Sequence, residues 1–201
     1  VASSNAGDAL KILGGVSFKD LGSDDQKLLL KNRILLAEKS QNWPTARIAT
    51  DDYLSLKDLT TEEKDFGYEH KAYLAELILD FKTAYTALKA QSKPASQYRM
   101  ALMADLAGDD PIPYLQKQIL VTTDAKEKRT LASKIVMDSK DGEKEWAKYK
   151  DLFKDDPEAY ADLARTLYSR HPSPAFFNSV KAQTGLKATS GYRMIVREEI
   201  F

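Results

Sequence analysis

Apolar residues return every three or four positions along most of this chain, and charged residues fill the positions between them. Residues 28–39 show the pattern clearly: leucines and an isoleucine recur at that spacing among lysine, arginine and glutamate. Such spacing gathers apolar side chains on one face of an α-helix. No alternating run of strand type and no Asn-Gly hairpin signal interrupts it before Gly185. The pattern therefore predicts an all-α fold.

Capping residues and helix breakers divide this pattern into short helices. Ser23 with Gln26, and Thr60 with Glu63, have the spacing of a capping box, in which two side chains satisfy the free amides of a helix start. Asp156-Pro157 combines a capping carboxylate with a proline at the first helical position. Pro44, Gly108-Asp109-Asp110-Pro111 and Asp141-Gly142 mark further ends or starts.

Two stretches allow more than one interpretation. Residues 61–91 form either one unbroken helix or two helices separated at Asp80-Phe81, and we favour the break. Beyond Gly185, Tyr192, Met194 and Val196 alternate with polar residues, so a short strand or an extended tail competes with a helix. The resulting division is an N-terminal helix and linker over 1–22, a helical domain over 23–184 and a C-terminal tail over 185–201.

The short helices come in pairs, and each pair turns at a comparable place. The four turns are Gln41-Asn42-Trp43-Pro44-Thr45-Ala46, Leu79-Asp80-Phe81-Lys82-Thr83-Ala84, Ala107-Gly108-Asp109-Asp110 and Asp141-Gly142-Glu143-Lys144-Glu145-Trp146-Ala147. Aligning Ala46, Ala84, Pro113 and Ala147 gives spacings of 38, 29 and 34 residues. A repeat of about 34 residues is typical of paired-helix arrays, whose units bury their apolar faces by stacking.

These turns resemble those of tetratricopeptide repeats over roughly residues 24–170. Ala72 with Ala75, and Ala101 with Ala104, match the small residues that this family places at close helix contacts. Arg33 and Lys71 depart from it, because they fall where the family prefers leucine, and Pro113 replaces an alanine. The resemblance implies a right-handed α-α superhelix, or solenoid, of antiparallel helix pairs. An irregular globular helical bundle and the helical superhelix of some lytic transglycosylases remain alternatives.

Composition and charge narrow the choice of partner. The 30 basic residues balance 30 acidic ones, which argues against non-specific binding to nucleic acid or anionic membranes. There is no cysteine, and no apolar run approaches the roughly 18 residues that a membrane span needs. The chain begins at Val1 rather than Met, which a removed targeting segment or trimming would explain, and it ends at Phe201 without a polar tail, so we expect a piece of a longer protein. Its compartment is open: cytoplasmic, or periplasmic or secreted after processing.

The sequence shows no set of residues with a catalytic or metal-binding pattern. His70 and His171 are its two histidines, and neither has a partner at ligand spacing, so no metal is predicted. We interpret His70 as a partly exposed polar residue and His171 as a residue at a helix end. Acidic pairs such as Asp109-Asp110 lie at turns, where capping and solvation explain them. Gly14-Gly15 lacks the lysine and hydroxyl of a phosphate loop. We expect no cofactor.

The repeat resemblance implies that the first helix of each pair lines a concave groove. The candidate groove residues by alignment are Lys31, Leu35, Glu38, Glu69, Tyr73, Glu76, Tyr98, Leu102 and Asp105. Trp43 and Trp146 are interpreted as packing residues. Some family members clamp a terminal carboxylate with Lys and Asn one turn apart, but here Lys27 is followed by Lys31.

The hypothesis for function is a non-catalytic scaffold that binds a peptide, a partner domain or a flanking domain of the same protein. The alternatives are the helical domain of a larger cell-wall-active hydrolase and a purely structural spacer.

Overall fold

The computed structural model describes residues 2–93, 95–170, 172–182, 186 and 188–200, and every regular element in them is helical. The chain divides into two compact units, Val1–Pro111 and Ile112–Phe201, and the boundary falls inside the 23–184 range treated above as one domain. The first unit contains α1 (Ala2–Gly14), η1 (Phe18–Asp20), α2 (Ser23–Lys39), α3 (Trp43–Leu54), α4 (Thr61–Leu77), α5 (Phe81–Ala90) and α6 (Gln97–Ala107). The second contains α7 (Ile112–Val121), α8 (Ala125–Asp138), α9 (Gly142–Tyr149), η2 (Lys150–Phe153), α10 (Pro157–Arg170), α11 (Pro174–Lys181) and α12 (Ser190–Ile200). The all-α prediction is confirmed for this part of the chain.

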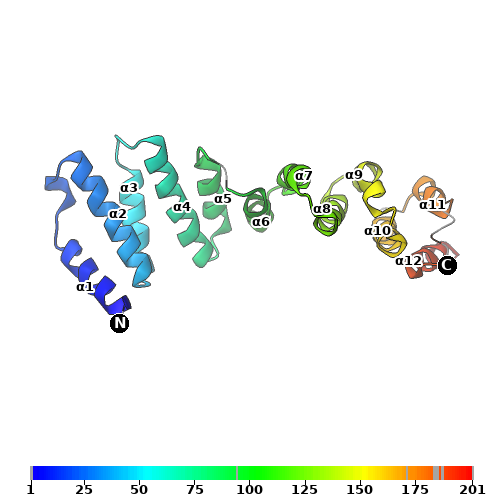
Figure 1. Cartoon of the computed structure of the whole chain (residues 1–201), viewed down its shortest axis with the longest axis horizontal. Helices are drawn as coiled ribbons and strands as arrows, with labels where there is room; N and C mark the ends of the chain where they lie inside the picture. The colour runs from blue at the N-terminus through cyan, green and yellow to red at the C-terminus, as the bar shows by residue number, and fades with distance from the viewer. Residues whose placement is uncertain (1, 94, 171, 183–185, 187, 201) are drawn as a thin grey trace. The chain divides into compact units, whose positions relative to one another are not determined.

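In the first unit, α2 packs against α3 and α4 packs against α5 as neighbouring helices joined by tight turns (Figure 1). Both turns have the same geometry, with a left-handed residue followed by a capping side chain. Gln41 has φ of 58° and Leu79 has φ of 61°. Asn42 and Asp80 come next, and their side chains accept hydrogen bonds from the amides of Thr45 and Thr83. The predicted break at Asp80-Phe81 is confirmed.

The backbone of these turns repeats a third time at the end of α6. The Asn42 amide donates to the carbonyl of Ala37 at 2.8 Å, and the Asp80 amide donates to the carbonyl of Ala75 at 2.9 Å. At the third turn Gly108 takes the left-handed position, with φ of 78°, and the next amide again bonds five residues back. This is the Schellman ending of a helix, which satisfies carbonyls that have no partner within the helix. The three left-handed residues are 38 and 29 positions apart, as in the sequence alignment.

Alanines and larger apolar residues together form the core of the first unit. Leu30, Ile34, Ala49, Tyr53 and Leu59 make one buried cluster between α2, α3 and the loop before α4. A second cluster consists of Leu10, Ala37, Ala46 and Leu74. The alanines aligned above at 72, 75, 101 and 104 are all buried. Small side chains let helix backbones approach, so the aligned alanines lie where helices pack closely.

Aromatic packing organises the second unit. The Trp146 ring on α9 lies 4.6 Å from that of Tyr160 and 5.9 Å from that of Phe176, centroid to centroid, and is buried. Its predicted packing role is therefore confirmed. At Gly191 on α12, an added Cβ would lie 2.7 Å from the backbone carbon of Ala161. Helices α10 and α12 thus meet at a position where no side chain fits.

Several local expectations have clear outcomes. The Thr60–Glu63 capping box is present, and Asp156 accepts from the amide of Ala159 at the start of α10. The Ser23–Gln26 capping box is wrong: Gly22 is the N-cap, and the Gln26 side chain donates to the carbonyl of Leu21 instead. For the tail, the helix alternative is the one observed, as α12. His171 lies outside the described residues.

Candidate binding surface

The nine aligned residues occupy equivalent positions on α2, α4 and α6, and we call the surface they form the first-helix face. The spacings of 38 and 29 residues sort them into three rows. The rows are Lys31, Glu69 and Tyr98; Leu35, Tyr73 and Leu102; and Glu38, Glu76 and Asp105. An apolar row therefore runs beside a row made only of carboxylates. All nine residues belong to the first unit.

The apolar row is half-exposed on all three helices. Leu35 is 47% exposed, Tyr73 is 40% exposed and Leu102 is 54% exposed. The Tyr73 ring also contacts the Trp43 ring edge to face, at a centroid distance of 6.5 Å. Single exposed apolar residues are ordinary on a protein surface. Three at equivalent positions on α2, α4 and α6 instead form a repeated row of exposed apolar side chains.

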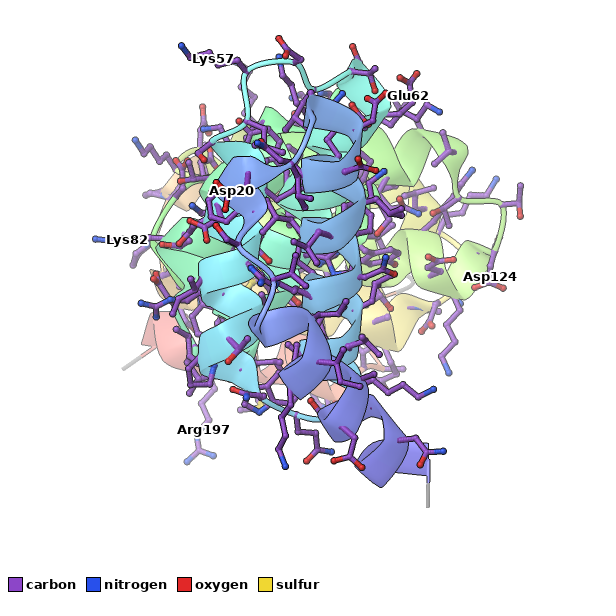
Figure 2. All side chains as sticks on the ribbon, turned by 90° about the vertical axis from the view of Figure 1, so that its left-hand side faces the viewer. Asp20, Lys57, Glu62, Lys82, Asp124 and Arg197 are labelled. Carbon is purple, nitrogen blue, oxygen red and sulfur yellow. The ribbon has the colours of Figure 1, made fainter. Side chains whose placement is uncertain are left out.

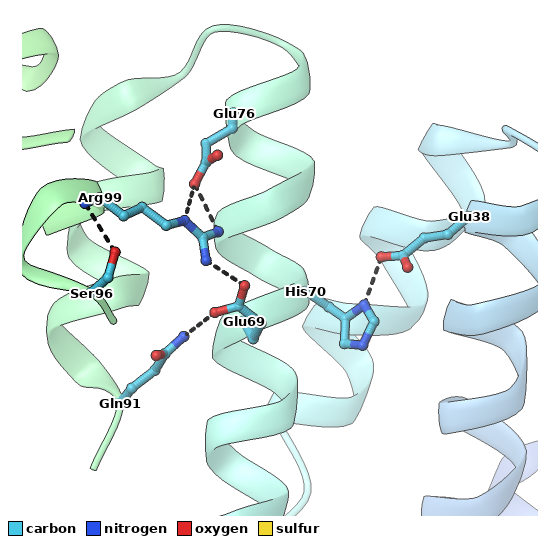
Figure 3. Close-up of polar contacts among 7 residues, drawn as sticks. All are labelled: Glu38, Glu69, His70, Glu76, Gln91, Ser96 and Arg99. Atoms are coloured by element: carbon cyan, nitrogen blue, oxygen red, sulfur yellow. Dashed lines mark hydrogen bonds and ion pairs between the residues drawn. The ribbon is translucent and has the colours of Figure 1, made fainter. Parts of the chain in front are cut away.

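Arg99 joins α4 to α6 through the carboxylates of this face (Figure 3). Its Nε and Nη2 atoms donate to Glu76 Oε1 at 3.0 and 2.8 Å, and its Nη1 atom donates to Glu69 Oε1 at 2.5 Å. Gln91 donates to the other oxygen of Glu69 at 2.8 Å. Burial raises the pKa of Glu69, but the hydrogen bonds from Arg99 and Gln91 outweigh it and hold that pKa below its usual value. One cation is thus shared by two carboxylates.

His70 joins α2 to α4 on the same side of the unit. Its Nδ1 atom lies 2.7 Å from Glu38 Oε1, and both side chains are less than one-fifth exposed (Figure 3). The imidazole also lies 4.3 Å from the Phe66 ring, centroid to centroid. The partial exposure expected of His70 is observed. Its partner lies 32 residues away along the chain, and no spacing in the sequence indicates the pairing.

Two lysines of α2, Lys27 and Lys31, make contacts within the unit. Lys31 lies above the rings of Tyr53 and Phe66, with its Nζ 5.8 and 5.3 Å from their centroids. Lys27 is mostly buried and pairs with Glu63 at 3.2 Å. The hydrogen bond from the Thr60 amide lowers the pKa of Glu63, and Lys27 contributes to the same shift. Both lysines therefore contribute to packing between α2 and α4.

Sequence reasoning missed the polar residues that link neighbouring helices. Arg99 is the main omission, and the spacing of Glu69 and Glu76, seven residues apart on one helix face, was the available signal. Arg33 and Lys71, the two departures from the repeat pattern, also make links. Arg33 donates to the carbonyl oxygens of Leu13 and Val16 at the end of α1, and Lys71 pairs with Asp51 of α3 at 2.8 Å. Charged residues thus replace the expected leucine where they have partners on the preceding helix.

The described residues contain neither a metal-binding cluster nor a membrane-spanning helix. No group of three or more histidine, aspartate or glutamate side chains is arranged to hold a metal ion within the described ranges. Within those same ranges, no helix combines the length and apolarity that crossing a membrane requires. Comparison with known proteins finds no family model, no curated protein and no solved structure that matches this chain.

Proposed function

We propose that this protein is a non-catalytic binding scaffold, built as a tetratricopeptide-like right-handed stack of helix pairs. The first-helix face takes a segment of a partner protein that carries apolar and basic side chains. The observation behind this proposal is the pairing of rows: a half-exposed apolar side chain and an acidic side chain occupy equivalent positions on α2, α4 and α6.

Support for a stacked arrangement comes from the repetition inside the first unit. The left-handed turns at Gln41, Leu79 and Gly108 end three first helices in the same way. Side chains then connect those first helices directly, from Glu38 to His70 and from Glu76 to Arg99. A repeated turn with contacts between neighbouring repeats is the construction of a helical repeat array.

The chemistry of the face supports a basic and apolar partner. Covering Leu35, Tyr73 and Leu102 removes apolar area from water, which contributes about 25 cal/mol per Å². Glu69 and Glu76 share the single cation of Arg99, so the pair keeps a negative charge that a partner lysine or arginine would complement. Tyr73 is the expected anchor, because tyrosine offers a large rigid area together with a hydroxyl group.

A peptide titration tests this function. The probe is a fluorescent peptide of about 15 residues with leucine and lysine at helical spacing, a form suited to surfaces built from helices. Its binding is followed by anisotropy for the wild type and for Tyr73→Ala, Tyr73→Phe and Glu76→Gln. Leu120→Ala is the matched control, because Leu120 is an exposed apolar residue in the second unit.

We expect Tyr73→Ala to weaken binding about 30-fold, as for an anchor residue worth about 2 kcal/mol. Tyr73→Phe and Glu76→Gln should have smaller effects, and Leu120→Ala should have none. Equal binding by Tyr73→Ala and the wild type would exclude the first-helix face. The hydrolase alternative has its own test, which is turnover of a polysaccharide panel by the purified chain.

A further inference from the structure

Helix α4 presents a second surface on the side opposite to the first-helix face. Successive helical residues are rotated by about 100°, so Lys71 and Leu74 share one side of α4 while Tyr73 and Glu76 lie roughly opposite; Ile78 is the residue that caps the end of α4. Leu74 and Ile78 line cavities together with residues of α3, whereas Tyr73 and Glu76 belong to the first-helix face. The two surfaces are therefore separable by substitution.

Two adjoining cavities lie between α3, α4 and the start of α5. One has a volume of about 250 Å³ and is lined by Arg47, Thr50, Asp51, Lys71, Leu74, Ala75, Ile78, Asp80 and Thr83. The other, of about 260 Å³, is lined by Trp43, Pro44, Arg47, Ile48, Leu74 and Ile78. A cavity of about 150 Å³ already holds a benzene molecule. Each cavity is therefore large enough for one bulky side chain of a partner.

Arg47 lies between these cavities, and its guanidinium has no direct hydrogen bond among the described contacts. The other polar groups of the lining are engaged: Asp80 accepts from Thr83, Asp51 accepts from Lys71, and the Thr50 hydroxyl donates to the carbonyl of Ala46. Hydrogen bonds from Thr83 hold the pKa of Asp80 below its usual value, with a smaller contribution from the charge of Arg47. Arg47 therefore offers donors to an incoming anionic group.

The rim of the cavities is apolar and exposed. Ile48 is 63% exposed and Ile78 is 51% exposed, and both line the second cavity. Together with the cavities, these side chains form an apolar surface around one arginine. Interfaces between proteins commonly combine an apolar anchor in a pocket with an arginine beside it. The two exposed isoleucines at the rim favour a macromolecular partner over a small molecule, which would leave them uncovered.

We propose that this second surface binds an acidic segment of a partner protein. A large apolar side chain of that segment enters the cavity lined by Trp43 and Ile48, and a neighbouring carboxylate pairs with Arg47. The charge preference is opposite to that of the first-helix face, which takes basic segments. The site does not rest on the function proposed above, because Arg47 and Ile48 lie on α3 and none of the residues of the first-helix face lines its cavities.

Nuclear magnetic resonance of the ¹⁵N-labelled chain tests the site with three probes of different charge, of which the acidic and neutral ones are nearly equal in shape. They are the capped tripeptides acetyl-Glu-Phe-Glu-amide, acetyl-Gln-Phe-Gln-amide and acetyl-Lys-Phe-Lys-amide. The variants are Arg47→Gln, which removes the cation, and Ile48→Glu, which places a carboxylate on the apolar rim. Lys57→Gln is the matched control, since the exposed Lys57 side chain points away from the ribbon (Figure 2).

The acidic probe should shift the amide signals of Arg47, Ile48 and Ile78, and it should bind more tightly than the neutral and basic probes. Arg47→Gln should weaken its binding about fivefold, the effect of losing one partly exposed ion pair. Ile48→Glu should weaken it further, whereas Lys57→Gln and Leu102→Ala should not change it. Leu102 belongs to the first-helix face and lies on α6, so its result separates this site from that face.

Three outcomes would overturn the proposal. The first is equal binding of the acidic and neutral probes, which would remove the role of Arg47 as an anion partner. The second is equal or tighter binding of free acetyl-phenylalanine, which would identify a small-molecule site. The third is a self-associated wild type that becomes monomeric in Arg47→Gln, which would identify a second copy of the chain as the occupant.

Discussion

Replacing Arg99 should loosen the connection between α4 and α6 and change how stability depends on pH. The informative substitution is Arg99→Met, which keeps most of the side-chain length and removes the guanidinium. It deletes the three hydrogen bonds by which Arg99 holds the carboxylates of Glu69 and Glu76 close to each other. Ser96 would still cap α6 through the backbone amide of residue 99, so the helix itself should persist.

The size of the effect lies between two limits. Hydrogen bonds to charged groups contribute about 1.5–3 kcal/mol when buried, and exposed ion pairs contribute at most about 1 kcal/mol. Arg99 is 27% exposed, and its partners Glu69 and Glu76 are 48% and 27% exposed, so screening by solvent reduces the first figure. We therefore expect Arg99→Met to lower the free energy of unfolding by about 1–2 kcal/mol.

The pH dependence gives a second and more specific readout. The pKa of Glu69 is lowered in the folded state, so its stabilisation is fully present above the unfolded value of about 4.3. That stabilisation is lost as the pH falls through the folded pKa. Between pH 7 and pH 3, the wild type should lose more stability than Arg99→Met, because the variant no longer has the cation that favours the ionised form.

Urea unfolding of the two units can be followed separately. Trp43 lies in the first unit and Trp146 in the second, so a Trp146→Phe background makes fluorescence report on the unit that contains Arg99. If the free energy of unfolding falls by about 2 kcal/mol per M urea, the expected loss of stability lowers the midpoint of unfolding by about 0.5–1 M urea. An unchanged midpoint at pH 7, or equal acid sensitivity of the two proteins, would refute the role assigned to Arg99.

The remaining predictions concern local contacts. Arg33→Ala should leave the carbonyl of Leu13 without its side-chain donor, and faster amide hydrogen exchange confined to α1 would show it. Gly191→Ala should lower the melting temperature of the second unit, because its Cβ would meet the backbone of Ala161; an unchanged melting temperature would contradict that close approach. Leu79→Gly should raise stability by up to about 1 kcal/mol in urea titrations, since a left-handed residue other than glycine costs about 1–2 kcal/mol.

Many helix starts and ends could be predicted from the sequence, because they depend on residues that are close together along the chain. Thr60 with Glu63 marks a helix start because two side chains three positions apart satisfy free amides there, and Asp156 marks one because its carboxylate accepts from the Ala159 amide. The break at Asp80 was favoured because a second set of apolar residues follows it, and the structure adds that the Asp80 side chain caps α5. The local signal failed at Ser23, where Gly22 took the capping position and Gln26 bonded to Leu21 instead. Capping spacing predicts that a helix begins nearby, and the competing bonds decide at which residue.

The sequence by itself determined the helices, their turns and the residues that share a face, because these depend on spacing along the chain. The alignment of Leu35 with Tyr73 follows from a repeat that the turns at Gln41 and Leu79 share. Only the tertiary structure decided which charged side chains meet. The pairing of Glu38 with His70 spans 32 residues, and Arg99 selects partners 23 and 30 residues away. Such contacts depend on how neighbouring helices are placed, and no periodicity within one helix encodes that placement.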